Sequence, residues 1–208
     1  MLKISKKYNS RTGFTIIELV ISIFILSMAV VGIFSAFSVV TILTSDSIDK
    51  LTGTYLAQEG MEVVRNIRDT NWLNMDNGSG TSWDDNGLQC NILSGCEMKA
   101  DYASIQLSGY TDDYLYLDSN GFYSYNTSNA TETKIKRKII VTPITDVDGD
   151  AENIHIIKVT VEVSWDKKAT LLNPALHAGQ CDIDNGIPSA NCIVAEDTLY
   201  NWYNYKYQ

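Results

Sequence analysis

The residues with the most specific chemistry lie between positions 3 and 18. Four basic residues precede a Gly13-Phe14 pair, and Glu18 is the one charged residue in the apolar run that ends at Leu43. Cleavage between Gly13 and Phe14 would give Phe14 a free ammonium group, whereas an ionised carboxylate at the depth of Glu18 costs about 2.5–3.5 kcal/mol in a bilayer. Within one helix these groups are separated by about 6 Å along the axis, so the cation is better supplied by an adjacent copy. The pattern therefore predicts assembly.

The segment that positions these groups is long enough to cross a membrane. The uncharged stretch from Leu19 to Leu43 contains 25 residues, and at about 1.5 Å per residue a helix of this length exceeds a hydrocarbon core of about 30 Å. The four basic residues of the leader precede this stretch, while Asp46 and Asp49 follow it. This asymmetry predicts a single-pass protein of the cytoplasmic membrane, with residues 1–13 inside and the remainder outside.

The junction resembles a known family signature, that of the type IV prepilins, in residues 13–20 (GFTIIELV). Pilins and the pseudopilins of type II secretion share this signature. The resemblance implies that a prepilin peptidase cleaves after Gly13 and methylates Phe14, and that Glu18 supports methylation and subunit docking. It also implies two kinds of partner, namely other pilin or pseudopilin subunits and an inner-membrane assembly platform. A plain membrane anchor with an accidental Gly-Phe pair is the alternative.

Beyond the anchor at 14–43, residues 44–70 are expected to continue the helix with an amphipathic pattern. Apolar residues recur there at spacings of three to four, with charged residues between them; they are Ile48, Leu51, Tyr55, Leu56, Val63, Val64 and Ile67. Asp69-Thr70-Asn71 favours a turn and predicts the helix end at about Arg68.

Residues 71–208 are expected to form one extracytoplasmic, β-rich globular domain. Met75 to Asn91 is rich in loop-forming residues. Alternation predicts strands at 135–141 and 156–165, and a last strand is expected at 198–205. A long helix laid on an antiparallel sheet is an α+β fold, which the pilin resemblance also implies.

A hairpin is expected within this domain. Tyr114–Leu117 and Phe122–Tyr125 flank the sequence Asp118-Ser119-Asn120-Gly121. An Asn-Gly pair between apolar runs predicts a hairpin, because both residues tolerate positive φ in a turn.

The four cysteines lie on the predicted outer side of the membrane, where disulfides can form. Pairing Cys90 with Cys96 and Cys181 with Cys192 is favoured because each pair closes a short loop rich in Gly, Asn or Ser. Free or cross-paired thiols are the alternative.

One acidic cluster is a candidate for calcium, which takes six to eight oxygen ligands. It consists of Asp146, Asp148, Asp150 and Glu152. A solvated turn between two strands is the favoured interpretation, so no cofactor is expected and Ca²⁺ is the alternative.

Charge disfavours nucleic acid as a partner. Loss of the four basic residues of the leader changes the net charge from −9 to −13, and such a surface repels phosphate overall. A basic run, Lys134, Lys136, Arg137 and Lys138, could form a local DNA patch in a competence pilus, although a solvated strand face is favoured. The aromatic tail Trp202, Tyr203, Tyr205 and Tyr207 could stack on sugars or bases.

The sequence thus predicts a structural subunit, with a minor one favoured, of a type IV pilus or pseudopilus. It would reside in the membrane before assembly and in a surface pilus or an envelope pseudopilus afterwards. Neither His155 nor His177 has a recognisable catalytic partner in the sequence, so no enzyme is expected. A membrane-anchored module for adhesion or DNA uptake is the alternative.

Overall fold

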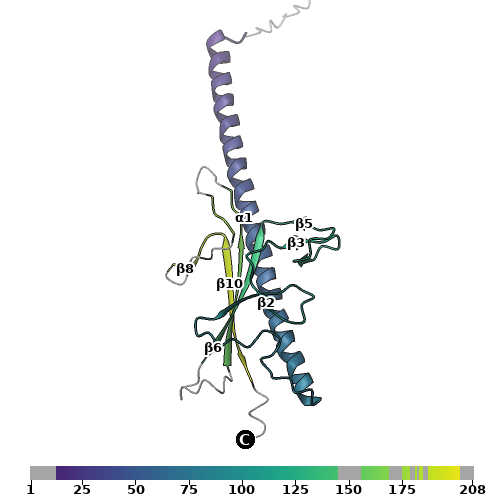
Figure 1. Ribbon diagram of the computed structural model, residues 1–208. Coiled ribbons are helices and arrows are strands. Elements are labelled where there is room, and N and C mark those ends of the chain that lie inside the picture. The colour runs from purple at the N-terminus through teal and green to yellow at the C-terminus, as the bar shows by residue number, and fades with distance from the viewer. Residues whose placement is uncertain are drawn as a thin grey trace, which may run out of the picture. The chain divides into compact units, whose positions relative to one another are not determined.

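The computed structural model describes residues 13–144, 156–168, 175–178, 181, 183–184 and 187–201. Within these described ranges, one helix, α1 (Ile16–Asp76), is followed by ten strands (Figure 1). The chain divides into two compact units, Met1–Ser47 and Ile48–Gln208. The first contains the apolar part of α1, and the second contains the remainder of α1 with the strands. The α+β, pilin-like layout predicted from the sequence is confirmed.

A five-stranded antiparallel sheet forms the centre of the second unit. Its strand order is β10-β7-β6-β1-β2, and its strands are β1 (Cys96–Lys99), β2 (Ser108–Gly109), β6 (Ile135–Ile144), β7 (Ile156–Trp165) and β10 (Cys192–Tyr200). The shorter strands β3 (Tyr116–Leu117), β4 (Tyr123–Ser124) and β5 (Thr131–Glu132) form a second sheet, and β8 (Ile183–Asp184) pairs with β9 (Ile187–Pro188).

The alternation predicted for the strand at 156–165 is confirmed on its apolar face. Ile157, Val159, Val161, Val163 and Trp165 are each at most 2% exposed. Two helix glycines let this face approach α1 closely: a Cβ on Gly53 would lie 2.9 Å from the Trp165 ring, and one on Gly60 would lie 3.0 Å from Val161 Cγ1. The apolar face of β7 and the second half of α1 therefore form one core.

A buried arginine also joins the sheet to the helix. Arg137 of β6 is 0% exposed. Its guanidinium donates to Leu56 O at 3.1 Å, to Glu59 Oε1 at 2.9 Å and to Ala100 O at 2.6 Å. Because a buried charge needs such partners, Arg137 couples the burial of the helix to that of the sheet.

The helix ends later than the sequence predicted. Asp69-Thr70-Asn71 is helical, and α1 continues to Asp76. Asn71 is buried, and its amide donates to Trp83 O at 3.1 Å and to Asp85 O at 2.8 Å. These tertiary hydrogen bonds outweigh the turn preference of the three residues. The segment after the helix is irregular, as expected of a loop, but it buries Trp83 and Leu88.

The predicted hairpin is present as β3 and β4, and backbone hydrogen bonds close its turn. Gly121 N donates to Asp118 O at 3.1 Å, and Asp118 N donates to Phe122 O at 2.9 Å. Positive φ occurs at Gly121 (88°) and not at Asn120. The loop is therefore a three-residue connection in which only the glycine adopts the left-handed conformation.

The last strand also differs from its prediction. β10 covers Cys192–Tyr200 and so begins six residues before the predicted start at Thr198. It pairs with β7 throughout, from Cys192 opposite Ser164 to Tyr200 opposite Ile156. Its polar residues, Glu196 and Asp197 among them, obscured the strand pattern in the sequence.

Candidate functional site: the N-terminal helix start

The first turn of α1 is closed by Thr15. Its Oγ1 accepts from Glu18 N at 3.4 Å, and its carbonyl accepts from Leu19 N at 3.2 Å. Thr15 is thus the N-cap, with Glu18 at the third helical position, where a carboxylate favours the positive end of the helix dipole. Sequence reasoning missed this role of Thr15, although a Thr followed three residues later by Glu is a known N-cap signal.

The predicted processing and assembly residues lie within this turn and just before it. Gly13 and Phe14 precede the helix, Phe14 is 77% exposed, and Glu18 is exposed on the first turn. Within the described ranges, Glu18 has no salt-bridge partner. The structure therefore brings the three residues together while leaving the carboxylate available to a cation from elsewhere.

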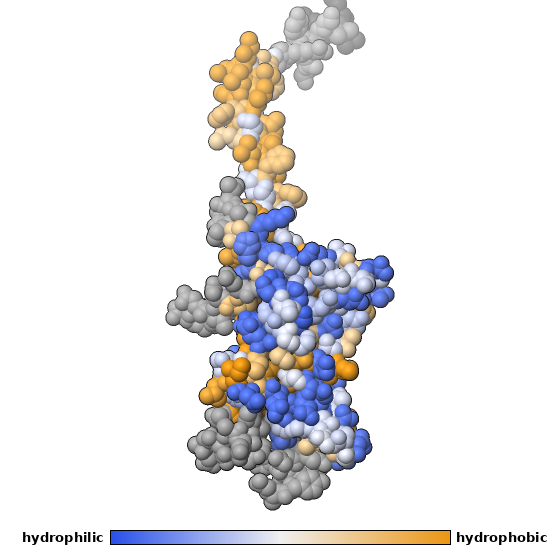
Figure 2. All heavy atoms as spheres, in the orientation of Figure 1, coloured by the Kyte–Doolittle hydropathy of each residue, from blue (hydrophilic) through white to orange (hydrophobic). Residues whose placement is uncertain are grey.

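The following turns of α1, as far as Leu43, present an apolar surface. The large apolar side chains from Ile16 to Leu43, other than the partly exposed Ile42, are 43–84% exposed, and they account for the orange region of the helix in Figure 2. By length and composition this helix can cross a membrane. A set of its hydroxyls donates to backbone carbonyls three or four residues earlier, which suits an apolar medium; these are Ser22, Ser27, Ser38, Thr41 and Thr44.

Comparison with known families gives a match at this same segment. Residues 8–34 match the family described as the prokaryotic N-terminal methylation motif. The chain therefore carries an N-terminal signal of the type IV pilin kind. The motif is typical of both pilins and pseudopilins, and the apolar helix fits a membrane-anchored pilin. No curated protein and no solved structure matches the chain.

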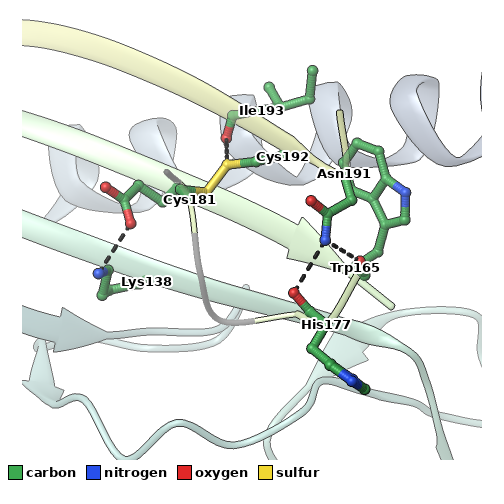
Figure 3. The surroundings of a disulfide bond; sticks show 8 residues. Lys138, Trp165, His177, Cys181, Asn191, Cys192 and Ile193 are labelled. Atoms are coloured by element: carbon green, nitrogen blue, oxygen red, sulfur yellow. Dashed lines mark hydrogen bonds and ion pairs between the residues drawn. A yellow bond between two sulfur atoms is a disulfide. The ribbon is translucent and has the colours of Figure 1, made fainter. Parts of the chain in front are cut away.

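Both disulfides predicted for this chain are present. Cys90 is joined to Cys96 and Cys181 to Cys192, with Cα–Cα distances of 5.8 and 5.6 Å. Figure 3 shows the second bond beside Asn191, whose buried amide donates to Trp165 O at 2.8 Å and to His177 O at 3.1 Å. The bond and this amide fasten Cys181 and His177, respectively, to the start of β10.

The basic run on β6 is not the solvated face that the sequence suggested. Arg137 is in the core, and Lys136 is 7% exposed. Each of the four cations has a carboxylate partner: Lys134 pairs with Asp49 (2.6 Å), Lys136 with Asp112 (2.8 Å), Arg137 with Glu59 (2.9 Å), and Lys138 with Glu162 (3.0 Å) and Glu97 (3.1 Å). These cations are therefore neutralised locally.

Two pKa shifts reflect this pairing. The hydrogen bond from Lys136 Nζ lowers the pKa of Asp112. Burial alone would lower the pKa of Lys138, but hydrogen bonds to Glu162 and Glu97 bring it above its usual value. Asp112 and Lys138 are thus charged at neutral pH. The alternation in the sequence could not reveal this pairing, because the carboxylates come from α1 (Asp49 and Glu59), from the loop at Asp112 and from the neighbouring strands β1 and β7.

Two sets of candidate residues lie outside the described residues. They are the calcium candidates Asp146, Asp148, Asp150 and Glu152, and the aromatic tail from Trp202 to Tyr207. His155 is also outside, whereas His177 is described and its side chain is 87% exposed.

Proposed function

We propose that this chain is a minor structural subunit of a type IV pilus or pseudopilus. The methylation motif at residues 8–34 carries the proposal. Prepilin peptidase cleaves after Gly13 and methylates Phe14, and an inner-membrane assembly platform then adds the subunit to the fibre. The role is structural and requires no cofactor.

Assembly uses the surface that also anchors the precursor. The exposed apolar side chains between Ile16 and Leu43 are buried first in lipid and then against the helices of neighbouring subunits. Glu18 meets the Phe14 ammonium of a neighbour, which removes the cost of its charge in an apolar environment. The subunit therefore moves from the cytoplasmic membrane to a surface pilus or to an envelope pseudopilus.

Mass spectrometry of the protein from its native cells tests the processing step. The expected N-terminal peptide begins at Phe14 and carries one methyl group on its nitrogen. A mature protein that still begins at Met1 would refute the proposal.

Replacement of Glu18 by Ala tests the assembly step. Insertion and cleavage after Gly13 should persist, while recovery in sheared or purified fibres should fall at least tenfold. Ser22→Ala is the matched control, because Ser22 lies one turn later and its hydroxyl bonds only to its own helix, at Glu18 O. Normal incorporation of Glu18→Ala would show that the carboxylate has no part in assembly.

A further inference from the structure

A polar cleft of about 320 Å³ lies in the second unit. Three loops line it: the turn at Asp101 after β1, the β3–β4 turn at Asp118, and the loop that follows Ser124 of β4. In Figure 2 the region of β3 and β5 has a mainly hydrophilic surface. The cleft is independent of the processing and assembly residues.

The lining of the cleft includes a buried hydroxyl group, that of Ser124, whose hydrogen has no described acceptor. Ser124 is 6% exposed. Its Oγ accepts from Asn126 N at 3.2 Å, while among the described residues nothing accepts its hydroxyl hydrogen. A buried donor of this kind is costly unless something in the cleft pairs with it. An acceptor atom of a ligand in the cleft would therefore satisfy the Ser124 hydroxyl.

Two carboxylates are held in fixed positions in the cleft walls. Asp118 Oδ1 accepts from Asn120 N at 2.8 Å and from Phe122 N at 2.9 Å. Asp101 Oδ1 accepts from Ala103 N at 3.1 Å and from the hydroxyl of Ser104. The Asn120 side chain also donates to the Asp118 carboxylate, whose remaining lone pairs can accept from a ligand.

The charge of the cleft selects the class of ligand. The hydrogen bond from Phe122 N lowers the pKa of Asp118, so this group is ionised at neutral pH. None of the residues that line the cleft is basic. The walls consequently attract hydroxyl and ammonium donors and repel carboxylates, sulfates and phosphates.

An aromatic pair supplies an apolar wall. Tyr102 lines the cleft, and its ring stacks on Phe122 with centroids 4.9 Å apart and planes 27° from parallel. The two residues remain 45% and 52% exposed. Such a supported ring offers a flat face to the C–H groups of a ligand while nearby polar groups fix its orientation.

We propose that this cleft binds a saccharide that is uncharged or carries an amino group. Asp118 and Asp101 accept from its hydroxyls, Ser124 and the Asn120 amide donate to its oxygens, and Tyr102 packs against the apolar face of the sugar ring. This proposal does not depend on the pilus assignment, because it rests on the loops of the second unit.

The test is a glycan array probed with the full chain in lipid nanodiscs, because common detergents are themselves glycosides. Neutral and amino glycans should bind, and sialylated or uronate-bearing glycans should not. Tyr102→Ala and Asn120→Ala should each weaken binding at least tenfold, whereas Tyr102→Phe, which keeps the ring, should bind within threefold of the parent protein.

Tyr200→Ala and Asn77→Ala are the matched controls, since both residues are exposed and neither lines the cleft. They should bind as the parent does. The circular dichroism and thermal unfolding of the two cleft variants should also match those of the parent. The absence of binding to every neutral and amino glycan would overturn the proposal. So would a preference for acidic glycans, equal loss in the controls, or binding that disappears when Ca²⁺ is chelated.

Discussion

The two halves of α1 belong to one continuous helix but differ in burial. Between Ile16 and Leu43 none of the helix is buried, and its large apolar side chains face outward. From Gly53 to Trp72 one face is buried against the sheet, with ten buried residues in this half. The first half therefore suits an apolar environment, and the second half suits the core of a folded domain. Both halves are helical, so it is the pattern of burial that distinguishes their roles.

The difference also has an electrostatic side. The first half contains a single charge, Glu18, that has no described partner. In the second half charges are paired across to the sheet, as in Arg65 with Asp197 at 2.7 Å and Asp49 with Lys134 at 2.6 Å. A charge that lacks a partner within the chain suggests an external one, whereas paired charges indicate internal structure.

The largest expected effect comes from breaking the buried pair of the second half. Arg137→Ala should destabilise the second unit by about 3–5 kcal/mol, because it leaves Glu59 and two buried carbonyls without their donor. Denaturant unfolding followed by tryptophan fluorescence measures this change. Lys134→Ala is the control: its ion pair is partly exposed, with a side-chain exposure of 46%, and its loss should cost at most about 1 kcal/mol. Equal effects would contradict the role given to Arg137.

Overpacking of the same interface should have the next largest effect. Gly60→Leu adds a side chain where a Cβ would already lie 3.0 Å from Val161 Cγ1 and 3.2 Å from Arg137 Cδ. The expected cost is about 1–3 kcal/mol in the free energy of unfolding, measured by the same denaturation. Gly32→Leu, in the first half where nothing lies within 4 Å of the added Cβ, should leave the unfolding of the second unit unchanged. A destabilised Gly32 variant would argue against the separation of the halves.

Acid should weaken the second half in particular. Burial alone would raise the pKa of Asp197, but hydrogen bonds from Arg65 and from Thr198 N bring it below its usual value. A carboxyl with a depressed folded-state pKa stabilises the fold above its unfolded pKa, and this contribution is lost as the pH falls below roughly 4. The thermal midpoint of the parent protein should therefore decrease as the pH is lowered below about 4.

Asp197→Asn sharpens this prediction. The variant should be less stable than the parent at pH 7, and its thermal midpoint should depend less on pH below about 4, since it lacks one of the titrating groups. Identical acid profiles for the two proteins would exclude a contribution from the Arg65–Asp197 pair.

The smallest effect is expected from the helix cap of the first half. Thr15→Ala should speed hydrogen exchange at the Glu18 amide, because an N-cap contributes about 1 kcal/mol locally. Unfolding of the second unit should be unaffected. Thr15→Ser, which retains the hydroxyl, should exchange as the parent does. Unchanged exchange in Thr15→Ala would show that the cap does not hold the first turn.

The sequence was informative where a pattern is local. The β7 alternation and both disulfide pairings follow from neighbouring residues, and the structure contains each of them. The N-terminal motif is also local, and residues 8–34 match its family.

Prediction failed where distant residues decide. Asn71 remains helical because its amide reaches Trp83 and Asp85, and Arg137 is buried because Leu56 and Ala100 offer their carbonyls. The saccharide cleft combines three loops that are separate in the sequence. No window of neighbouring residues contains these contacts.

Gly53 and Gly60 have one further consequence, for mechanical load. They are seven residues apart, about two helical turns, so both face the sheet. Sliding the helix along its axis would move the buried side chains one turn away on this face, Leu56 and Ala57, toward Trp165 or Val161. Tension applied to the helix would then press side chains against the sheet instead of letting the helix slide. The close packing at these two glycines therefore resists axial sliding when the subunit is pulled along its length.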